Sequence, residues 1–189
     1  MTEVDSNFPF IDDSILRANL DLTFNLIVKL VPISVHHETK KELPEEIVSS
    51  IRKQIIINTA SIIEALILSV LKKHKTPEVF DIKMEIFKID KIIYITEDSK
   101  KIVLGHHFEK IEKCRFDKLN LGNMIDLCHD HGILNTVLLE HVKKVKDIRN
   151  RQHLGSLKFV DGDYSHSELE FVFSVAKEIK NLAKIINKR

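Results

Sequence analysis

The stretch "IIINTASIIEALILSVL", residues 55–71, decides the fold. On a helix drawn through it, isoleucine and leucine side chains cover most of the circumference. A helix that is apolar on nearly all sides is packed by several neighbours. Small or polar residues form one narrow strip, at which a neighbouring helix is expected to approach closely: Asn58, Ser61, Ala65 and Ser69. The sequence therefore predicts a central helix inside a bundle.

Helix-start signals precede this central helix. Pro44, Glu45 and Glu46 are typical of a first helical turn, so the helix is expected to begin there and to run to about Lys73. Apolar spacing also predicts an earlier helix. Its expected limits are residues 11–31, with Asp12 or Asp13 as its cap, Pro32 as its stop and a polar connector over 36–46.

Cap residues predict three more helices in the C-terminal part of the chain. Polar side chains at a helix start accept hydrogen bonds from its first backbone N–H groups, and glycine suits the position after its end. The first expected helix covers residues 121–132, with Gly132 as the glycine that ends it. The second covers 136–153, with Asn135 at its start and Gly155 near its end. The third covers 166–187, with Ser165 and Glu168 spaced as a capping box.

The pattern changes between these helices. "KIIYIT" (91–96), a polar turn and "IVLGHHF" (102–108) predict two short strands, and "IKMEIFKI" (82–89) is a candidate third strand. The predicted fold class is therefore mainly α. We expect a single domain over 1–189, an antiparallel bundle of about five helices with a small β-hairpin insertion at about 82–108.

Composition limits the class of protein. Among 189 residues, 43% are hydrophobic and 30% charged, which is typical of a folded globular chain. The formal net charge of +1 gives no overall field for nucleic acid, so any basic site must be local.

Cys114 and Cys128 are expected to be reduced structural thiols. The acidic N-terminus lacks the pattern of a secretory signal, and residues 55–71 are expected to be too short and too polar to span a bilayer, so we expect a cytoplasmic protein without a membrane partner.

Two residues at the end of the 136–153 helix lie where apolar residues belong. At about 100° per residue, Arg149 falls inside the stripe made by Leu138 and Val142, and His153 falls at its edge, one turn further on. A guanidinium is rarely buried without a partner. Two explanations follow: Arg149 pairs with a carboxylate such as Glu64 and supports the bundle, or the helix end opens into a cleft where Arg149 and His153 meet a ligand.

The surroundings of this pair are basic. Six Lys or Arg lie between residues 143 and 158 against a single acid, Asp147. Such a local cluster fits a phosphate-bearing partner, although a solvated helix face has the same composition. The candidate RNA-binding residues are Lys143, Lys146, Arg151 and Lys158.

The motif "DIRNRQHLG" (147–155), preceded by "MIDLCHDHGIL" (124–134) and followed by one more helix, resembles the HEPN superfamily (higher eukaryotes and prokaryotes nucleotide-binding domains). The central "TASIIEALILSVL" (59–71), with its glutamate, is similar to that family's second helix, and the resemblance covers most of the chain apart from about 80–115. It implies an all-α bundle and a homodimer. Ribonuclease members carry an Arg, a polar residue and a His, and cut RNA without metal.

The family motif maps onto Arg149, Asn150 and His153, which are the candidate catalytic residues. Three residues separate Arg149 from His153, whereas the family pattern has four to six, but the i, i+4 spacing keeps both side chains on one helix face. RNA supplies its own 2′-OH as nucleophile. His153 would move a proton, Arg149 would stabilise charge on phosphoryl oxygens, and Asn150 would orient the His or hold a phosphate.

The expected protein is a metal-independent endoribonuclease of toxin or phage-defence type, with a twofold dimer bringing two Arg–His pairs to a shared groove. The resemblance also implies a cognate antitoxin or a nucleotidyltransferase-type partner. The alternative is a non-catalytic dimeric module that binds RNA or nucleotides or another protein, with Arg149 and Asn150 structural. No cofactor is expected. A metal hydrolase built on "CHDHG" (128–132) is a weaker alternative, because no convincing further ligand set accompanies it.

Overall fold

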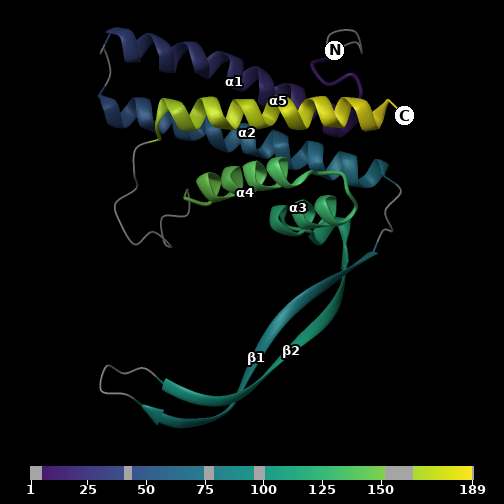
Figure 1. Cartoon of the computed structure of the whole chain (residues 1–189). Coiled ribbons are helices and arrows are strands. Elements are labelled where there is room, and N and C mark those ends of the chain that lie inside the picture. Colours follow the sequence, from purple (N-terminus) through teal and green to yellow (C-terminus); the bar gives the residue numbers. More distant parts are fainter. Residues whose placement is uncertain (1–5, 41–43, 75–78, 96–100, 152–163, 189) are drawn as a thin grey trace. The chain divides into compact units, whose positions relative to one another are not determined.

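The computed structural model describes residues 6–40, 44–74, 79–95, 101–151 and 164–188 (Figure 1). The chain forms two compact units, Met1–Thr76 with Asn120–Arg189, and Pro77–Leu119. The first unit is helical and the second is a two-stranded antiparallel sheet. The predicted class, mainly α with a β-hairpin insertion, is confirmed.

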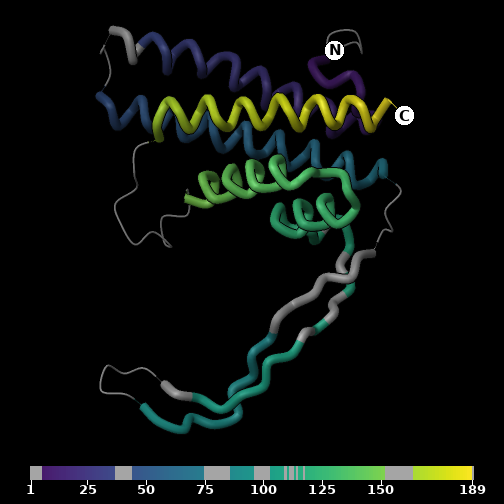
Figure 2. The backbone as a smooth tube through the Cα atoms, in the orientation of Figure 1, coloured from purple at the N-terminus to yellow at the C-terminus, as the bar shows by residue number. Residues whose placement is uncertain are grey.

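The helix α2 (Glu45–Lys73) is the centre of the helical unit, as predicted. It contacts α1 (Ser14–Lys40), α3 (Leu121–Asp130), α4 (Thr136–Asn150) and α5 (His166–Asn187), and the chain trace in Figure 2 shows α1 and α4 on opposite sides of it. Its apolar residues form the middle of the core, because neighbours cover several of its faces: Ile55, Ile56, Ile63, Leu66, Ile67 and Leu71 are fully buried.

Helix α1 begins where the sequence indicated but does not end there. The Asp13 Oδ1 accepts hydrogen bonds of 3.0 Å from the backbone N–H of Ile15 and of Leu16, so Asp13 is the cap. The prediction that Pro32 stops the helix is wrong, because Pro32 lies inside α1 and the helix continues to Lys40. Proline removes one backbone donor. Continued packing, shown by the buried Ser34 beyond Pro32, favours the helix over a break at this position.

The predicted caps of the last three helices are confirmed. The Asn135 side chain accepts a hydrogen bond of 2.8 Å from Leu138 N, and Ser165 with Glu168 forms the reciprocal capping box. Gly132 follows α3 with a φ of +67°, a left-handed conformation that a residue with a Cβ rarely adopts. The expected ending of α4 at Gly155 lies outside the described residues.

A short segment before α1 is tied to that helix by a buried carboxylate. Asp21 accepts hydrogen bonds from Ser6 Oγ (2.6 Å) and Asn7 N (2.7 Å). This fixes the segment so that the next apolar residues, Phe8, Phe10 and Ile11, enter the core. No sequence pattern predicts this contact, because Asp21 looks like an ordinary helix-surface residue.

The second unit is longer than predicted. Strand β1 (Val79–Ile95) pairs antiparallel with β2 (Lys101–Arg115), and irregularities at Ile89/Lys91 and Ile92/Tyr94 interrupt the register. The expectation of two short strands and a separate third strand is wrong, since 82–89 and 91–95 belong to the single strand β1. No Gly, Pro or Asn stands between those segments to turn the chain, so a β-bulge absorbs the change in pattern. A short 3-10 turn, Phe116–Lys118, follows β2.

Two helical segments, Ser14–His36 and Glu45–Lys73, are long and apolar enough to cross a membrane by length and composition alone. The expectation that the region around residues 55–71 is too short and too polar for this is therefore wrong, because α2 extends it at both ends. The apolar character of α2 has another source, since 56% of its window is buried inside the bundle. For α1 the buried share is only 22%, so the burial of α1 inside this unit does not account for its composition.

Candidate functional site at the end of helix α4

Arg149 lies in the last turn of α4 and reaches toward α2. Its Nη1 is 3.1 Å from Oε2 of Glu64, and the two side chains are 26% and 28% exposed. The sequence proposed this pairing as the structural explanation for an arginine in the apolar stripe, and the ion pair is present. Both charges still meet solvent, so the guanidinium is not sealed inside the core.

The Nε of Arg149 is buried and has no hydrogen-bond partner among the residues that the structure describes. A guanidinium has five N–H donors arranged as a planar fork, and the carboxylate of Glu64 contacts Nη1. An unsatisfied buried donor carries a free-energy cost that an added acceptor relieves. Because this Nε is shielded from solvent, an anionic oxygen from outside can meet Arg149 only at the exposed part of its side chain, about a quarter of it.

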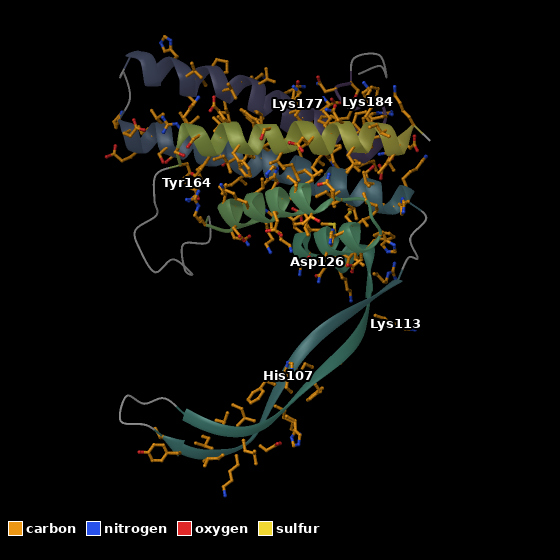
Figure 3. All side chains as sticks on the ribbon, viewed as in Figure 1. His107, Lys113, Asp126, Tyr164, Lys177 and Lys184 are labelled. Atoms are coloured by element: carbon orange, nitrogen blue, oxygen red, sulfur yellow. The ribbon has the colours of Figure 1, made fainter. Side chains whose placement is uncertain are left out.

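Arg151 turns to a different neighbour. Its Nη2 donates to Oε1 of Glu168 at 2.7 Å, and its guanidinium carbon is 4.9 Å from the ring centroid of Tyr164. Tyr164 precedes Ser165, the N-cap of α5, and is labelled in Figure 3 beside the end of α4. The Nε of Arg151 also lacks a partner within the described part of the chain. Arg151 thus joins the end of α4 to the start of α5.

A third arginine holds Tyr164 from the side of α2. Arg52 is only 7% exposed, and its Nη1 donates to Oε1 of Glu45 at 3.0 Å and to the carbonyl of Tyr164 at 3.2 Å. Ser49 Oγ accepts from the backbone N–H of Tyr164 at 3.0 Å. These contacts fix the backbone of Tyr164 against the first half of α2.

Lys53 completes the cationic surroundings of Tyr164, with its Nζ 5.4 Å from the ring centroid. The ring therefore has an ammonium and a guanidinium as cation–π neighbours. Sequence reasoning missed Arg52, Lys53 and Tyr164, because nothing local connects them with Arg151. The only available signal was an arginine within an apolar helix, the same kind of signal that drew attention to Arg149.

The remaining predicted site residues face other directions. Lys143 Nζ lies 3.8 Å from Asp126 Oδ1 of α3 and also 3.8 Å from Glu140 Oε1, and Lys146 approaches Gly122 of α3. Asn150 is exposed at the end of α4. The basic residues of α4 therefore point to α2, α3 and α5 and do not share one helix face. His153 and Lys158 lie outside the described residues.

The "CHDHG" segment makes structural contacts. Cys128 is fully buried in α3, and burial raises the pKa of its thiol to about 12. His129 Nδ1 lies 3.2 Å from the carbonyl oxygen of Leu134. In the described part of the chain, no three His, Cys, Asp or Glu side chains are grouped so as to hold a metal ion.

Comparison of the chain with protein-family models, with curated proteins and with solved structures found no match.

Proposed function

We propose that this chain is a HEPN-like RNA-acting protein that works as a homodimer and uses the cationic end of α4 to contact RNA. The observation that carries the proposal is the position of Arg149 and Arg151 at the end of α4, where their side chains are 26% and 36% exposed. Arginine forks bind phosphate oxygens with two parallel hydrogen bonds, and RNA presents such oxygens at every nucleotide.

The finer proposal is a metal-independent endoribonuclease. The 2′-OH of RNA attacks the neighbouring phosphorus, and the 5′ oxygen of the next nucleotide leaves. In this proposal His153 takes or returns the proton, and Arg149 stabilises the charge that grows on the phosphoryl oxygens. Asn150, exposed at the helix end, orients His153 or holds a phosphate oxygen. In this proposal the chain is a cytoplasmic ribonuclease of toxin or phage-defence type. Its proposed partner is an antitoxin or a nucleotidyltransferase-type protein.

Glu64 affects how strongly Arg149 binds a phosphate in this proposal. A carboxylate at 3.1 Å offsets much of the arginine charge, so phosphate binding is expected to compete with or share the Glu64 contact. Replacing Glu64 by Gln removes that competition and is expected to tighten RNA binding. Replacing Arg149 by Ala is expected to weaken RNA binding, most strongly at low salt.

The test is a pair of assays on the purified full chain. Fluorescence anisotropy measures the binding of a single-stranded RNA at two salt concentrations, and gel analysis measures its cleavage in the presence of EDTA. His153→Ala is expected to abolish cleavage while binding persists. Lys177→Ala is the matched control, since Lys177 is an exposed lysine on α5, away from the end of α4. Unchanged cleavage by His153→Ala would remove His153 from the mechanism.

The second candidate is a non-catalytic dimeric interaction module. The Arg149–Glu64 ion pair favours it, because the pair gives Arg149 a role in joining α4 to α2 without any ligand. On this alternative the protein binds RNA or nucleotides without cutting them, or binds only another protein. The same assays separate the two candidates, since binding without EDTA-resistant cleavage supports the module.

A further inference from the structure

Helices α1, α2 and α5 and the segment before α1 line a cavity of about 200 Å³. Protein interiors contain few voids larger than a water molecule, so a cavity of this size is a candidate ligand site. Some of its lining residues are buried and others are half-exposed, so the cavity is open to solvent. We call it the Phe8 cavity, with the buried lining residues Phe8, Ile27, Thr59 and Ile62 and the half-exposed ones Phe24, Phe173, Ala176 and Lys180.

The buried part of the Phe8 cavity offers almost no polar partner. Thr59 is the one polar residue there, and its hydroxyl already donates to the carbonyl of Ile55 at 2.8 Å. A bound water molecule needs about two to four polar partners, and apolar cavities stay dry without them. The part of a ligand that enters this cavity is therefore expected to be apolar.

Aromatic rings make up much of the lining. Phe8 and Phe24 meet edge to face, with ring centroids 6.0 Å apart and an angle of 87° between the planes, and Phe173 of α5 supplies a third ring. A further aromatic ring prefers neighbours in such edge-to-face positions. An apolar cavity of about 150 Å³ is large enough for benzene. The Phe8 cavity therefore has room for one phenyl ring with a short side arm.

Lys180 adds a cation to this apolar space. Its Nζ is 4.7 Å from the ring centroid of Phe8 and 5.4 Å from that of Phe24. Within the described part of the chain, Lys180 makes these ring contacts and forms no ion pair with a carboxylate. Burial lowers the pKa of Lys180, and Lys184 lowers it further, while Asp21 acts in the opposite direction. The ammonium group is therefore incompletely compensated.

Asp21 does not neutralise Lys180, because the segment before α1 occupies its carboxylate. Asp21 accepts hydrogen bonds from Ser6 Oγ at 2.6 Å, from Asn7 N at 2.7 Å and from Asn7 Nδ2 at 3.3 Å. Lys184, labelled on α5 in Figure 3, lies one turn beyond Lys180 and adds a second positive charge. The surroundings of Lys180 are therefore complementary to an anion.

We propose that the Phe8 cavity binds a small aromatic carboxylate, with the ring among the phenylalanines and the carboxylate paired with Lys180. The ammonium group favours this ligand over a neutral hydrocarbon, and a single buried cation suits one negative charge better than the two of a phosphate. Lys177 also lines the cavity, but it is exposed and its ammonium stays hydrated, so we assign it no role in the site. The inference is independent of RNA, because no residue of α4 lines the cavity.

The test is a titration of the full chain, labelled with ¹³C at its isoleucine methyl groups, with 3-phenylpropanoate. We expect a Kd on the order of 1 mM, as for other ligands of this size, and the largest shifts at the methyl groups of Ile27 and Ile62, which line the cavity. The neutral 3-phenylpropanamide is the matched ligand. It is expected to bind about tenfold more weakly, because it cannot form the charged pair with Lys180. The cation 3-phenylpropylamine is expected not to bind.

Two variants separate the charge of the site from its shape. Lys180→Gln is expected to lower the affinity for 3-phenylpropanoate to that for the amide. Ala176→Leu adds an isopropyl group to the lining and is expected to abolish binding of both ligands, while the melting temperature is retained because the position is half-exposed. Lys188→Gln is the matched control, an exposed lysine at the C-cap of α5, and is expected to bind like the wild type.

Four results would each overturn the proposal. They are a wild-type chain that does not bind 3-phenylpropanoate, equal affinities for the acid and the amide, shifts confined to isoleucines outside the cavity, and a Lys180→Gln chain that binds the acid as the wild type does. None of them bears on RNA binding, which is measured separately at the end of α4.

Discussion

Arg149 and Glu64 form an ion pair between α4 and α2, with 3.1 Å between Nη1 and Oε2 and about a quarter of each side chain exposed. The pair is intermediate between a surface salt bridge, which contributes little, and a buried one, whose disruption is costly. This intermediate position allows Arg149 both to support the bundle and to meet a ligand. It also makes the two roles experimentally separable.

We expect Arg149→Ala to lower the free energy of unfolding by about 1–2 kcal/mol, between the values typical of exposed and of buried pairs. Chemical denaturation of Arg149→Ala, Glu64→Gln and the double variant measures the coupling between the two side chains. If Arg149 is mainly structural, the two single variants destabilise alike and the double variant adds little. A loss larger than about 3 kcal/mol would indicate a buried structural ion and would count against a role in binding RNA.

Arg52 is the more deeply buried cation and should behave differently. It is 7% exposed and donates to the carbonyl of Tyr164 and to Glu45. We expect Arg52→Ala to destabilise the chain by about 3 kcal/mol, because Tyr164 loses a charge-assisted hydrogen bond and a buried site is emptied. Lys53→Ala is the adjacent control, because Lys53 is less buried than Arg52 and its Nζ has a cation–π contact of 5.4 Å with the Tyr164 ring. Equal melting temperatures for the two variants would contradict this assignment.

Local signals in the sequence were sufficient for much of the helical unit. The capping box of Ser165 and Glu168, the Asn135 cap and the glycine after α3 depend on neighbours within a few residues, so their patterns can be read directly. Pro32 was a wrong stop signal, because packing of α1 against the rest of the unit outweighed the local tendency of proline to end a helix. The hairpin was underestimated because a bulge interrupts its alternation without ending strand β1.

The candidate site was only partly predictable for a related reason. The Arg149–Glu64 pair could be anticipated, since both residues interrupt apolar helix faces and a buried charge requires a partner. The link from Arg52 to Tyr164 joins residues 112 positions apart, and neither residue carries a local sign of the other. The lysines and arginines of α4 contact three different helices. Their directions are set by how the helices pack, and the basic composition of the segment does not indicate them.

The buried thiol of Cys128 gives a prediction about its chemical reactivity. Burial raises the pKa of its thiol to about 12, so the thiolate is scarce in the native protein at neutral pH. We expect iodoacetamide to leave Cys128 unmodified in the folded chain and to alkylate it after unfolding, as measured by mass spectrometry of the peptide. Rapid native alkylation would show that α3 opens easily.

The raised pKa of Cys128 also determines how the free energy of unfolding changes with pH. Above the ordinary thiol pKa of about 8.5, the unfolded chain loses the Cys128 proton and the folded chain keeps it, so the unfolded state binds fewer protons. The free energy of unfolding should then fall with pH between that value and about 12, by at most about 1.4 kcal/mol per pH unit from this group. Cys128→Ala should reduce that slope, and an unchanged slope would mean that other groups account for it.

Gly105 gives a prediction for the hairpin alone. A Cβ added there would lie 2.5 Å from the carbonyl oxygen of Lys88 and 2.8 Å from Cζ of Phe87, closer than real Cβ contacts. Because the carbonyl is backbone, strands β1 and β2 would have to separate locally, so we expect Gly105→Ala to increase proteolytic cleavage within 79–115. Leu104→Thr, a change at an exposed neighbour on the same strand, is the control. The melting temperature of the helical unit should stay constant in both variants, because the strands belong to a separate compact unit. A lower melting temperature for Gly105→Ala would show that the hairpin contributes to the stability of the bundle.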